Sequence, residues 1–221
     1  MLNDDNGFLA VADGMGGAAA GEVASRIFIE TADELLSGKR SSEDETAEVV
    51  RRVFDAAHGR MLAWAKAHPE CRGMGCTAEA AAFLGRRYVV GHVGDSRTYL
   101  FRRGQLRQIT KDHSLVQQQL DEGIISQEEA RNHAFRNIIL RAVGTDERLV
   151  VDIVRGELHE GDCLLLCSDG LTDMVDDHAI ETVLSRPLPI SQKVESLVDL
   201  ARSAGGYDNI TAVITEASHA R

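Results

Sequence analysis

The sequence has no apolar segment that approaches the ~18 residues a helix needs to cross a membrane. Basic residues are also scarce: 24 Lys and Arg stand against 35 Asp and Glu, which gives a formal net charge of −11. Proteins bind nucleic acids through clustered Lys and Arg, so this balance argues against a nucleic-acid partner. Residues 1–5 do not resemble the start of a signal peptide, and we expect no membrane partner.

Two kinds of catalytic signature are missing as well. The sequence has no G-x-S-x-G elbow and no cysteine-based loop for phosphate, which argues against hydrolysis through a protein nucleophile. The four cysteines (Cys71, Cys76, Cys163 and Cys167) lack the paired C-x-x-C spacing of a zinc site. Cys163 and Cys167 flank three leucines, where cysteine behaves as a small hydrophobic residue. We therefore expect core cysteines in a reducing, cytoplasmic setting.

An apolar fraction of 43% and a charged fraction of 27% are ordinary for a globular protein, and 221 residues suit one large domain. Hydrophobic periodicity and turn residues predict strands at 8–12, 77–84, 87–93, 97–102, 105–109, 149–156, 163–167 and 210–215. They predict helices at 21–36, 45–67, 176–185 and 191–204, with two short ones in the polar stretch 112–146.

The connections between these elements indicate the class of fold. Tight turns such as Gly94-Asp95 and Arg103-Gly104 predict antiparallel pairing, because parallel strands need long crossovers. Helices gather in pairs at the beginning and the end, which favours sheets covered by helix layers over a doubly wound parallel sheet.

The start of the sequence is unusual. Asp5-Asn6-Gly7 is a hairpin-turn signal directly before strand 8–12, yet only residues 1–4 precede it. A hairpin needs an earlier strand, so we infer that the sequence begins inside an element and that the first strand is missing.

Aspartates recur beside small or turn-forming residues next to apolar strands: Asp13 before Gly14, Asp95 before Ser96, Asp169 before Gly170, and Asp208 before Asn209. Carboxylates at several strand ends repel one another unless a cation gathers them. Oxygen ligands suit hard ions, Mg²⁺ or Mn²⁺. Two such ions can activate a bridging water and neutralise a phosphoryl group.

The glycine-rich segment that starts at Gly14 also loosely satisfies a dinucleotide-binding fingerprint. However, Asp13 would place its charge against a pyrophosphate. Asp33 and Glu34, about twenty residues on, lie inside the first predicted helix rather than after a second strand. A nucleotide-dependent enzyme is therefore the weaker alternative.

A series of motifs resembles, in order and over essentially the whole chain, the bacterial PPM-type (type 2C) metal-dependent serine/threonine protein phosphatases. The motifs are Phe8-Leu-Ala-Val-Ala-Asp-Gly-Met-Gly-Gly17, Gly21-Glu22-Val-Ala-Ser25, Met74-Gly-Cys-Thr77, Val93-Gly-Asp-Ser-Arg97, Thr110-Lys-Asp-His-Ser114, Arg136-Asn137, Arg141-Ala-Val-Gly144, Ser168-Asp-Gly-Leu-Thr-Asp173 and Gly206-Tyr-Asp-Asn-Ile-Thr211.

This resemblance implies an α+β fold, a four-layer αββα sandwich of two antiparallel sheets flanked by helix pairs. Residues 1–221 would form a single catalytic domain, with 112–146 as a flap subdomain beside the metal cleft. The implied activity is hydrolysis of phosphoserine and phosphothreonine on proteins by a metal-activated water. The implied substrates are those of a bacterial serine/threonine kinase, and we expect a monomer.

The resemblance also implies a set of ligands for two Mn²⁺ or Mg²⁺ ions. Asp13 would bridge the ions, the Gly14 carbonyl would bind the second, and Asp169 and Asp208 would complete the first site. These three aspartates would hold the attacking water, and Asp95 with Asp169 would hold a third, weaker ion. Glycine at position 14 lets the backbone approach an ion closely, since it has no Cβ.

Two features depart from the family pattern. Relatives begin with a strand carrying an Arg-x-x-Asn-x-Asp motif, whose Arg grips the substrate phosphate, and no such motif precedes Phe8. The alternative function is therefore a catalytically impaired module that binds phosphoproteins or partners. Met15 stands where eukaryotic relatives have a histidine general acid, which leaves that acid unassigned. His113 could assist catalysis, but its position favours an ordinary residue at a helix N-terminus, and His92 is interpreted as a core residue.

Overall fold

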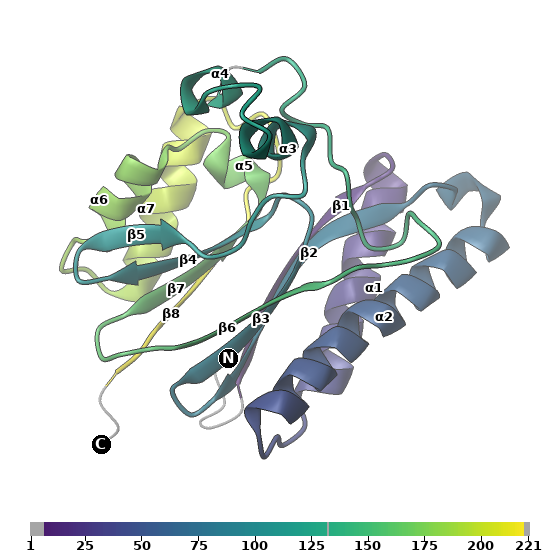
Figure 1. Ribbon diagram of the computed structural model, residues 1–221, viewed down its shortest axis with the longest axis horizontal. Coiled ribbons are helices and arrows are strands. Elements are labelled where there is room, and N and C mark those ends of the chain that lie inside the picture. The colour runs from purple at the N-terminus through teal and green to yellow at the C-terminus, as the bar shows by residue number, and fades with distance from the viewer. Residues whose placement is uncertain (1–6, 132, 219–221) are drawn as a thin grey trace.

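The computed structural model describes residues 7–131 and 133–218. Two four-stranded antiparallel sheets face each other, and helices cover the outer face of each (Figure 1). The first sheet has the order β1 (Phe8–Met15), β2 (Gly75–Leu84), β3 (Arg87–Val93) and β6 (Asp152–Glu157). The second has the order β5 (Gln105–Gln108), β4 (Arg97–Arg102), β7 (Cys163–Cys167) and β8 (Ala212–Glu216).

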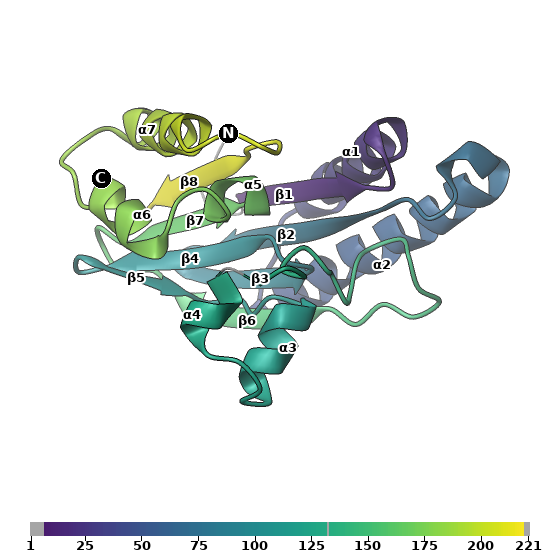
Figure 2. The same cartoon turned by 90° about the horizontal axis from the view of Figure 1, so that it is seen from above.

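The helices form the two outer layers, which are separated most clearly in Figure 2. The first sheet is covered by α1 (Ala18–Leu36) and α2 (Glu43–Ala67), and the second by α6 (Asp177–Leu184) and α7 (Ile190–Ser203). This arrangement confirms the predicted four-layer α+β sandwich. Further short elements are the turn of 3₁₀ helix η1 (Pro69–Cys71), α3 (Leu115–Asp121), α4 (Gln127–Arg131) and α5 (Asp169–Thr172).

The helix predicted at 45–67 is confirmed as α2 and begins two residues earlier, at Glu43. The Ser42 side chain caps α2 by accepting a hydrogen bond from the Glu45 amide (3.1 Å), and the Glu45 carboxylate accepts one from the Ser41 amide (2.7 Å). The first bond satisfies an amide that the first helical turn would otherwise leave without a partner, and the second holds the residue before the cap against the helix. None of the helices within residues 7–131 and 133–218 is both long and apolar enough to cross a membrane.

Strand alternation divides the interior into three apolar layers. On β1, Phe8, Ala10 and Ala12 pack against the helices, whereas Leu9 and Val11 face the other sheet. Because successive side chains of a strand point to opposite faces, Asp13 continues the row of Leu9 and Val11. The strand itself places this carboxylate at the end of the layer between the sheets.

The strand β1 is longer than predicted. Its pairing with β2 continues through Asp13 opposite Thr77 and Gly14 opposite Cys76, and it ends at Met15 instead of Ala12. Aspartate and glycine are poor strand formers, but the ladder to β2 satisfies their backbone groups. Asp13 is therefore carried by a hydrogen-bonded strand rather than by a turn.

The prediction that Gly94-Asp95 joins two paired strands is wrong. Strand β3 lies in the first sheet and β4 in the second, so residues 94–96 cross from one sheet to the other. Gly94 makes this crossing possible with φ 110°, a conformation that residues with a Cβ rarely adopt. A Cβ there would also overlap the Thr77 side chain.

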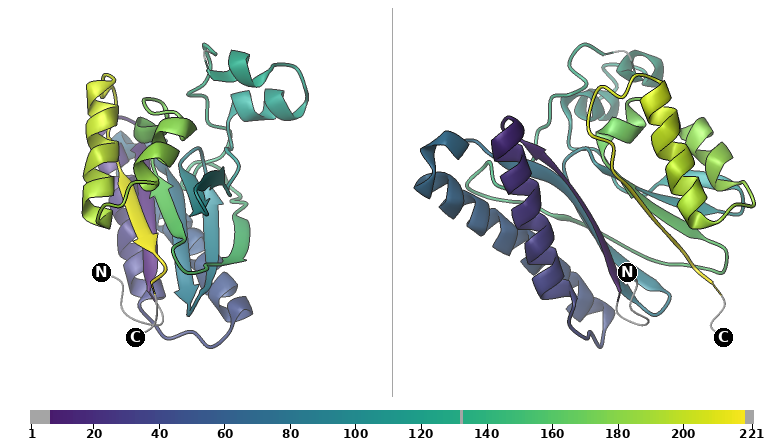
Figure 3. Two further views of the ribbon diagram at one scale, coloured as in Figure 1. Left: turned by 90° about the vertical axis from the view of Figure 1, so that its left-hand side faces the viewer. Right: turned by 180° about the vertical axis from the view of Figure 1, so that it is seen from behind.

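The segment 112–146 leaves the sandwich at the end where α5 lies, and its helices stand clear of the sheets (Figure 3). The two short helices predicted in this segment are confirmed as α3 and α4. The start and end of the segment meet at an isolated bridge between Ser114 and Ile139, and a second bridge joins Val143 to Cys76 on β2. Of the predicted turn at the start of the chain, Asp5 and Asn6 lie outside the described residues.

Candidate metal centre

The structure brings the aspartates of four separate segments to one end of the sandwich. Asp13 lies on β1, on the face that points toward the second sheet, and Asp95 lies in the segment that crosses between the sheets. Asp169 is the first residue of α5, which follows β7, and Asp208 lies shortly before β8. Burial and then the charge of Asp169 raise the pKa of Asp13 to about 8, and its hydrogen bond with Asp169 and the charges of Asp208 and Asp95 add to the shift. Carboxylates influence one another in this way only when they are neighbours.

Backbone contacts hold Asp208 beside Asp169. The Ser168 amide donates to the Thr211 carbonyl (3.1 Å), and the Thr211 amide donates to Ser168 Oγ (3.1 Å). Ser168 Oγ in turn donates to the Asn209 carbonyl (3.2 Å). Gly170 has no Cβ, which lets this carbonyl approach the first turn of α5 closely. The segment before β8 is thereby fastened to the end of β7.

Asp95 is the most buried of the four, with 8% of its surface exposed. Burial and then the charge of Asp169 raise the pKa of Asp95 to about 7. The neighbouring Ser96 hydroxyl shares a hydrogen bond with Thr77 Oγ1 (2.7 Å), which ties the crossing to β2. The fold thus holds a carboxyl group where water stabilises its charge poorly.

The donor set suits a hard divalent cation. Burial, chiefly, raises the pKa of Asp169, and its Oδ1 is buried without a hydrogen-bond partner. A buried carboxylate oxygen normally has a partner, so this atom is a candidate ligand. The chemistry is oxygen-only, which Mg²⁺ and Mn²⁺ prefer, and a cation would offset the repulsion among the four carboxylates.

The described residues do not hold a closed ligand cluster. Within residues 7–131 and 133–218, no three His, Cys, Asp or Glu side chains converge as a metal site requires. Asp13 and Asp169 are close enough for a hydrogen bond between them to affect the pKa of both, and Asp208 Oδ1 accepts from the Asn209 amide (2.7 Å). The structure thus places the predicted aspartates together, while the assignment of each to a particular ion stays a prediction.

Gly14 is required for a reason other than the one inferred from sequence. A Cβ at this position would overlap the Gly21 carbonyl oxygen, because the first turns of α1 pack directly on the end of β1. The glycine therefore allows the helix to approach the strand. Binding of an ion by the Gly14 carbonyl remains a prediction.

Sequence reasoning missed a polar network next to this site. Arg97 forms a two-pronged ion pair with Asp112, with Nη2 2.6 Å and Nε 3.0 Å from Oδ2. His92 is confirmed as a core residue: it is fully buried, pairs with Glu79 and lies 2.8 Å through Nε2 from the Lys111 carbonyl. Arg97 and Asp112 both lie in motifs that carry the family resemblance, but fifteen positions separate them, and no local sequence pattern indicates that they pair.

All four cysteines are buried and unpaired, as expected for core residues. Cys163 and Cys167 pack in the layer beneath α6 and α7. Burial raises the pKa of the Cys76 and Cys167 thiols far above the ordinary range, which keeps them uncharged and unreactive.

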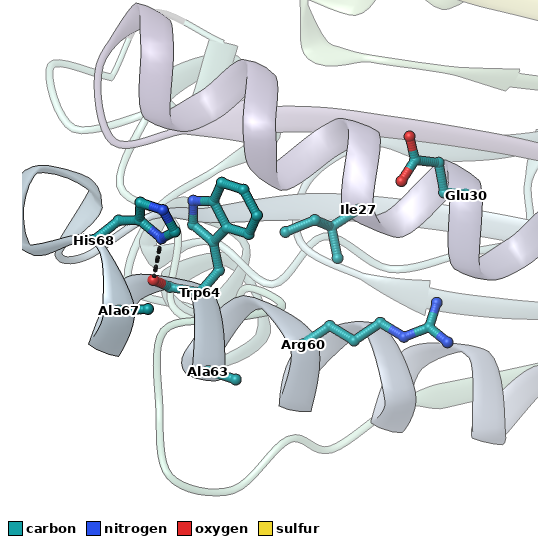
Figure 4. Close-up of a pocket in the computed structure, with 7 residues that line it drawn as sticks. All are labelled: Ile27, Glu30, Arg60, Ala63, Trp64, Ala67 and His68. Carbon is teal, nitrogen blue, oxygen red and sulfur yellow. Dashed lines mark hydrogen bonds between the residues drawn. The ribbon is translucent and has the colours of Figure 1, made fainter.

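A separate hollow of about 430 Å³ lies between α1 and α2. Trp64 stacks on His68 with ring centres 4.2 Å apart, and Ile27 and Arg60 lie nearby (Figure 4). None of the four aspartates lines this hollow. It is therefore distinct from the carboxylate site.

Comparison with known proteins places the chain in a family. A family model described as protein phosphatase 2C matches residues 2–213. The serine/threonine phosphatase stp of Listeria welshimeri is 40% identical over 230 residues, an alignment that covers 97% of this chain and 90% of that protein.

Two solved structures are similar over almost the whole chain. The crystal structure of the Mycobacterium tuberculosis serine/threonine phosphatase PstP/Ppp has a TM-score of 0.91 and 38% identity, and covers 98% of this chain and 93% of that one. The catalytic domain of the serine threonine protein phosphatase PstP, in complex with two manganese ions, has a TM-score of 0.88 and 37% identity with the same coverage. The chain therefore belongs to the protein phosphatase 2C family.

Proposed function

We propose that this chain is a metal-dependent protein phosphatase that hydrolyses phosphoserine and phosphothreonine. The observation that carries the proposal is the meeting of Asp13, Asp169, Asp208 and Asp95 at one end of the sandwich. The names of the relatives support the substrate class, and the two manganese ions of PstP support the cofactor.

The proposed ligands follow from where the side chains lie. Asp13, held on the β1–β2 ladder and close to the other three aspartates, would be shared by two ions, and Asp169 and Asp208 would complete the first site. The Gly14 carbonyl would hold the second ion, and Asp95 with Asp169 would hold a third. When bound, Mn²⁺ or Mg²⁺ activates a water and neutralises the phosphoryl group.

The protein residues act by placement and charge. The network around Ser168 fixes the distance between Asp169 and Asp208, and the β1–β2 ladder fixes Asp13. The carboxylates must be ionised to bind cations, so their raised pKa values predict metal binding that strengthens as the pH rises. No protein nucleophile is needed for this chemistry.

We also propose that the segment 112–146 is a flap beside the site. Arg136 of this segment lies 3.4 Å through Nε from Asp173 Oδ2, and the charge of Asp173 contributes to the raised pKa of Asp169. The exposed Phe135, Ile138 and Leu140 lie in the same segment. A substrate protein approaching the carboxylates would meet these side chains.

Three finer proposals complete the function. The substrates are proteins phosphorylated by a bacterial serine/threonine kinase, which the bacterial sources of the relatives support. The buried thiols support a reducing, cytoplasmic setting. We propose that the protein acts as a monomer, which light scattering after size-exclusion chromatography tests.

The experiment is phosphate release from a phosphothreonine peptide with and without Mn²⁺. We expect release to require Mn²⁺ and to stop with EDTA. Asp169→Asn should lower turnover by roughly 10³-fold or more, since it removes a charge that holds the ions. Asp55→Asn, an exposed position on α2, is the matched control and should keep normal turnover. Phosphopeptide binding without turnover would instead identify a catalytically impaired binding module.

A further inference from the structure

Residues Thr110 to Asp112 are hydrogen-bonded to the sandwich, and Ser114 is hydrogen-bonded to the flap segment. Thr110 Oγ1 accepts from the Thr98 amide (2.9 Å), and the Lys111 carbonyl lies 2.8 Å from His92 Nε2. Asp112 pairs with Arg97 as described. Ser114 caps α3 by accepting from the Gln117 amide (3.2 Å). This segment is therefore a fixed strap between the second sheet and the flap.

His113, within the strap, makes two hydrogen bonds to the residue that precedes Asp95. Its Nδ1 accepts from the Gly94 amide (3.0 Å), and its own amide donates to the Gly94 carbonyl (2.7 Å). Gly94 is the left-handed residue of the sheet crossing, wedged against Thr77. Gly94 lies just after the end of β3, so no neighbouring strand supplies a hydrogen-bond acceptor for its amide. The His113 imidazole supplies that acceptor.

His113 also contacts the residues at which the flap segment comes back to the sandwich. Its carbonyl accepts from the Leu140 amide (2.7 Å), and the Leu115 amide next in line donates to the Ile138 carbonyl (2.9 Å). The ring packs on His92 with centres 4.5 Å apart. Its Nε2 lies 3.3 Å from Asp152 Oδ2 and 2.9 Å from Arg141 Nη1.

We propose that His113 is a positioning residue that joins the flap to the Asp95 turn and sets where the Asp95 carboxylate lies. The role requires a hydrogen-bond acceptor at Nδ1, which places the proton of the neutral ring on Nε2. From there it can be donated to Asp152 Oδ2, whereas Arg141 Nη1, which is a donor only, cannot accept it. His113 acts through Gly94 and is not itself a catalytic residue. The consequence for metal binding rests on the proposed function, because that function makes Asp95 a ligand.

Three variants separate positioning from other roles. In His113→Asn, Oδ1 lies the same number of bonds from the backbone as Nδ1, so the acceptor for Gly94 is kept. In His113→Gln the acceptor moves one bond outward, to the place of Nε2, and His113→Ala has none. Residues that orient metal ligands typically contribute 10–100-fold to affinity or activity. We expect losses of roughly this size in Mn²⁺ affinity for the Ala and Gln variants, with most of the affinity restored in the Asn variant.

The first measurement needs no turnover. Amide hydrogen exchange of metal-free protein, followed by NMR, should show faster exchange at Gly94 and Leu140 in the Ala and Gln variants, and near-normal exchange in the Asn variant. Unchanged exchange at Gly94 would overturn the positioning role, and unchanged exchange at Leu140 would overturn the link to the flap. If His113→Ala fails to fold, the comparison of Asn with Gln decides the question alone.

Mn²⁺ calorimetry and turnover complete the test. An Asn variant as impaired as the Gln variant would show that the imidazole has a role other than accepting from Gly94, and would contradict the proposal. Wild-type protein that binds Mn²⁺ but releases no phosphate would refute the proposed function. The exchange at Gly94 would still test His113 in that case, so the two failures are distinguishable.

Discussion

Replacing Gly170 by alanine should push Asp208 away from Asp169. Gly170 lies in the single turn of α5, and a Cβ built on it would stand 2.2 Å from the Asn209 carbonyl oxygen. Its φ is not in the left-handed region, so alanine meets no backbone strain there. The displacement that the substitution causes is therefore steric, and it falls on Asn209, the residue next to Asp208.

The size of the displacement follows from the contact distance. Ordinary van der Waals contact begins at 3.4 Å, so the carbonyl must retreat by about 3.4 − 2.2 = 1.2 Å. Misplacing a group of an active site by about 1 Å can cost about 10²-fold in rate, and we expect a loss of that order in kcat/KM. Overpacking should also destabilise the protein by about 1–3 kcal/mol, partly offset by the better helix propensity of alanine.

The assay compares Gly170→Ala with Gly59→Ala. Gly59 lies on the exposed side of α2 with open space around it, so alanine there should stabilise the helix by about 0.5–1 kcal/mol and leave turnover unchanged. Urea unfolding measures the stability of both variants, and Mn²⁺-dependent phosphate release measures their activity. A Gly170→Ala protein within twofold of wild-type turnover would refute the view that close approach of Asn209 to α5 positions Asp208.

Other consequences can be measured independently. Gly94→Ala should lower the free energy of unfolding by about 1–3 kcal/mol or more, because a Cβ would overlap Thr77 and φ is 110°; a urea midpoint equal to wild type would contradict this. Leu166→Ala should cost about 2–5 kcal/mol, because Leu166 is fully buried between the sheets, and a smaller loss in urea unfolding would mean that this layer can collapse around the cavity. Burial alone would raise the pKa of Asp162, but hydrogen bonds from Arg102 and the His159 amide lower it. A lowered pKa stabilises the folded state at pH values above the ordinary carboxyl pKa. The stability advantage of wild type over Asp162→Asn should therefore be present at about pH 7 and shrink as the pH falls below about 4. An advantage that grows on acidification would contradict a lowered pKa for Asp162.

Much of the site follows from patterns that are visible in the sequence. The alternation of Leu9, Val11 and Asp13 already places the aspartate on the same face as two buried residues. The apolar run from Cys163 to Cys167 is a buried central strand, and the Asp169 that follows is held at its end. The start of α2 at Ser42 follows from the capping preference of serine.

Other features depend on contacts between distant segments. The turn at Gly94-Asp95 is as short as a hairpin turn, and only the pairing of β3 with β2 and β6, and of β4 with β5 and β7, shows that it crosses between sheets. The need for glycine at position 14 comes from Gly21, whose carbonyl oxygen a Cβ would overlap. Helix α5 has four residues, too few for a periodic signal.

The position of His113 shows the same limit. Beside a capping serine, the residue is typical of a helix N-terminus, and Ser114 does cap α3. Its hydrogen bond to the Gly94 amide joins residues nineteen positions apart. Local sequence patterns do not reach across that separation, because they report the period of one element and not its neighbour in space.

The claim that distant carboxylates share divalent ions is tested most directly in a crystal grown with Mn²⁺. Diffraction collected at the manganese absorption edge should give anomalous peaks on both sides of the Asp13 carboxylate, one of them also bounded by Asp169 and Asp208. Manganese bound only elsewhere, or these three side chains turned to separate surfaces, would contradict the account.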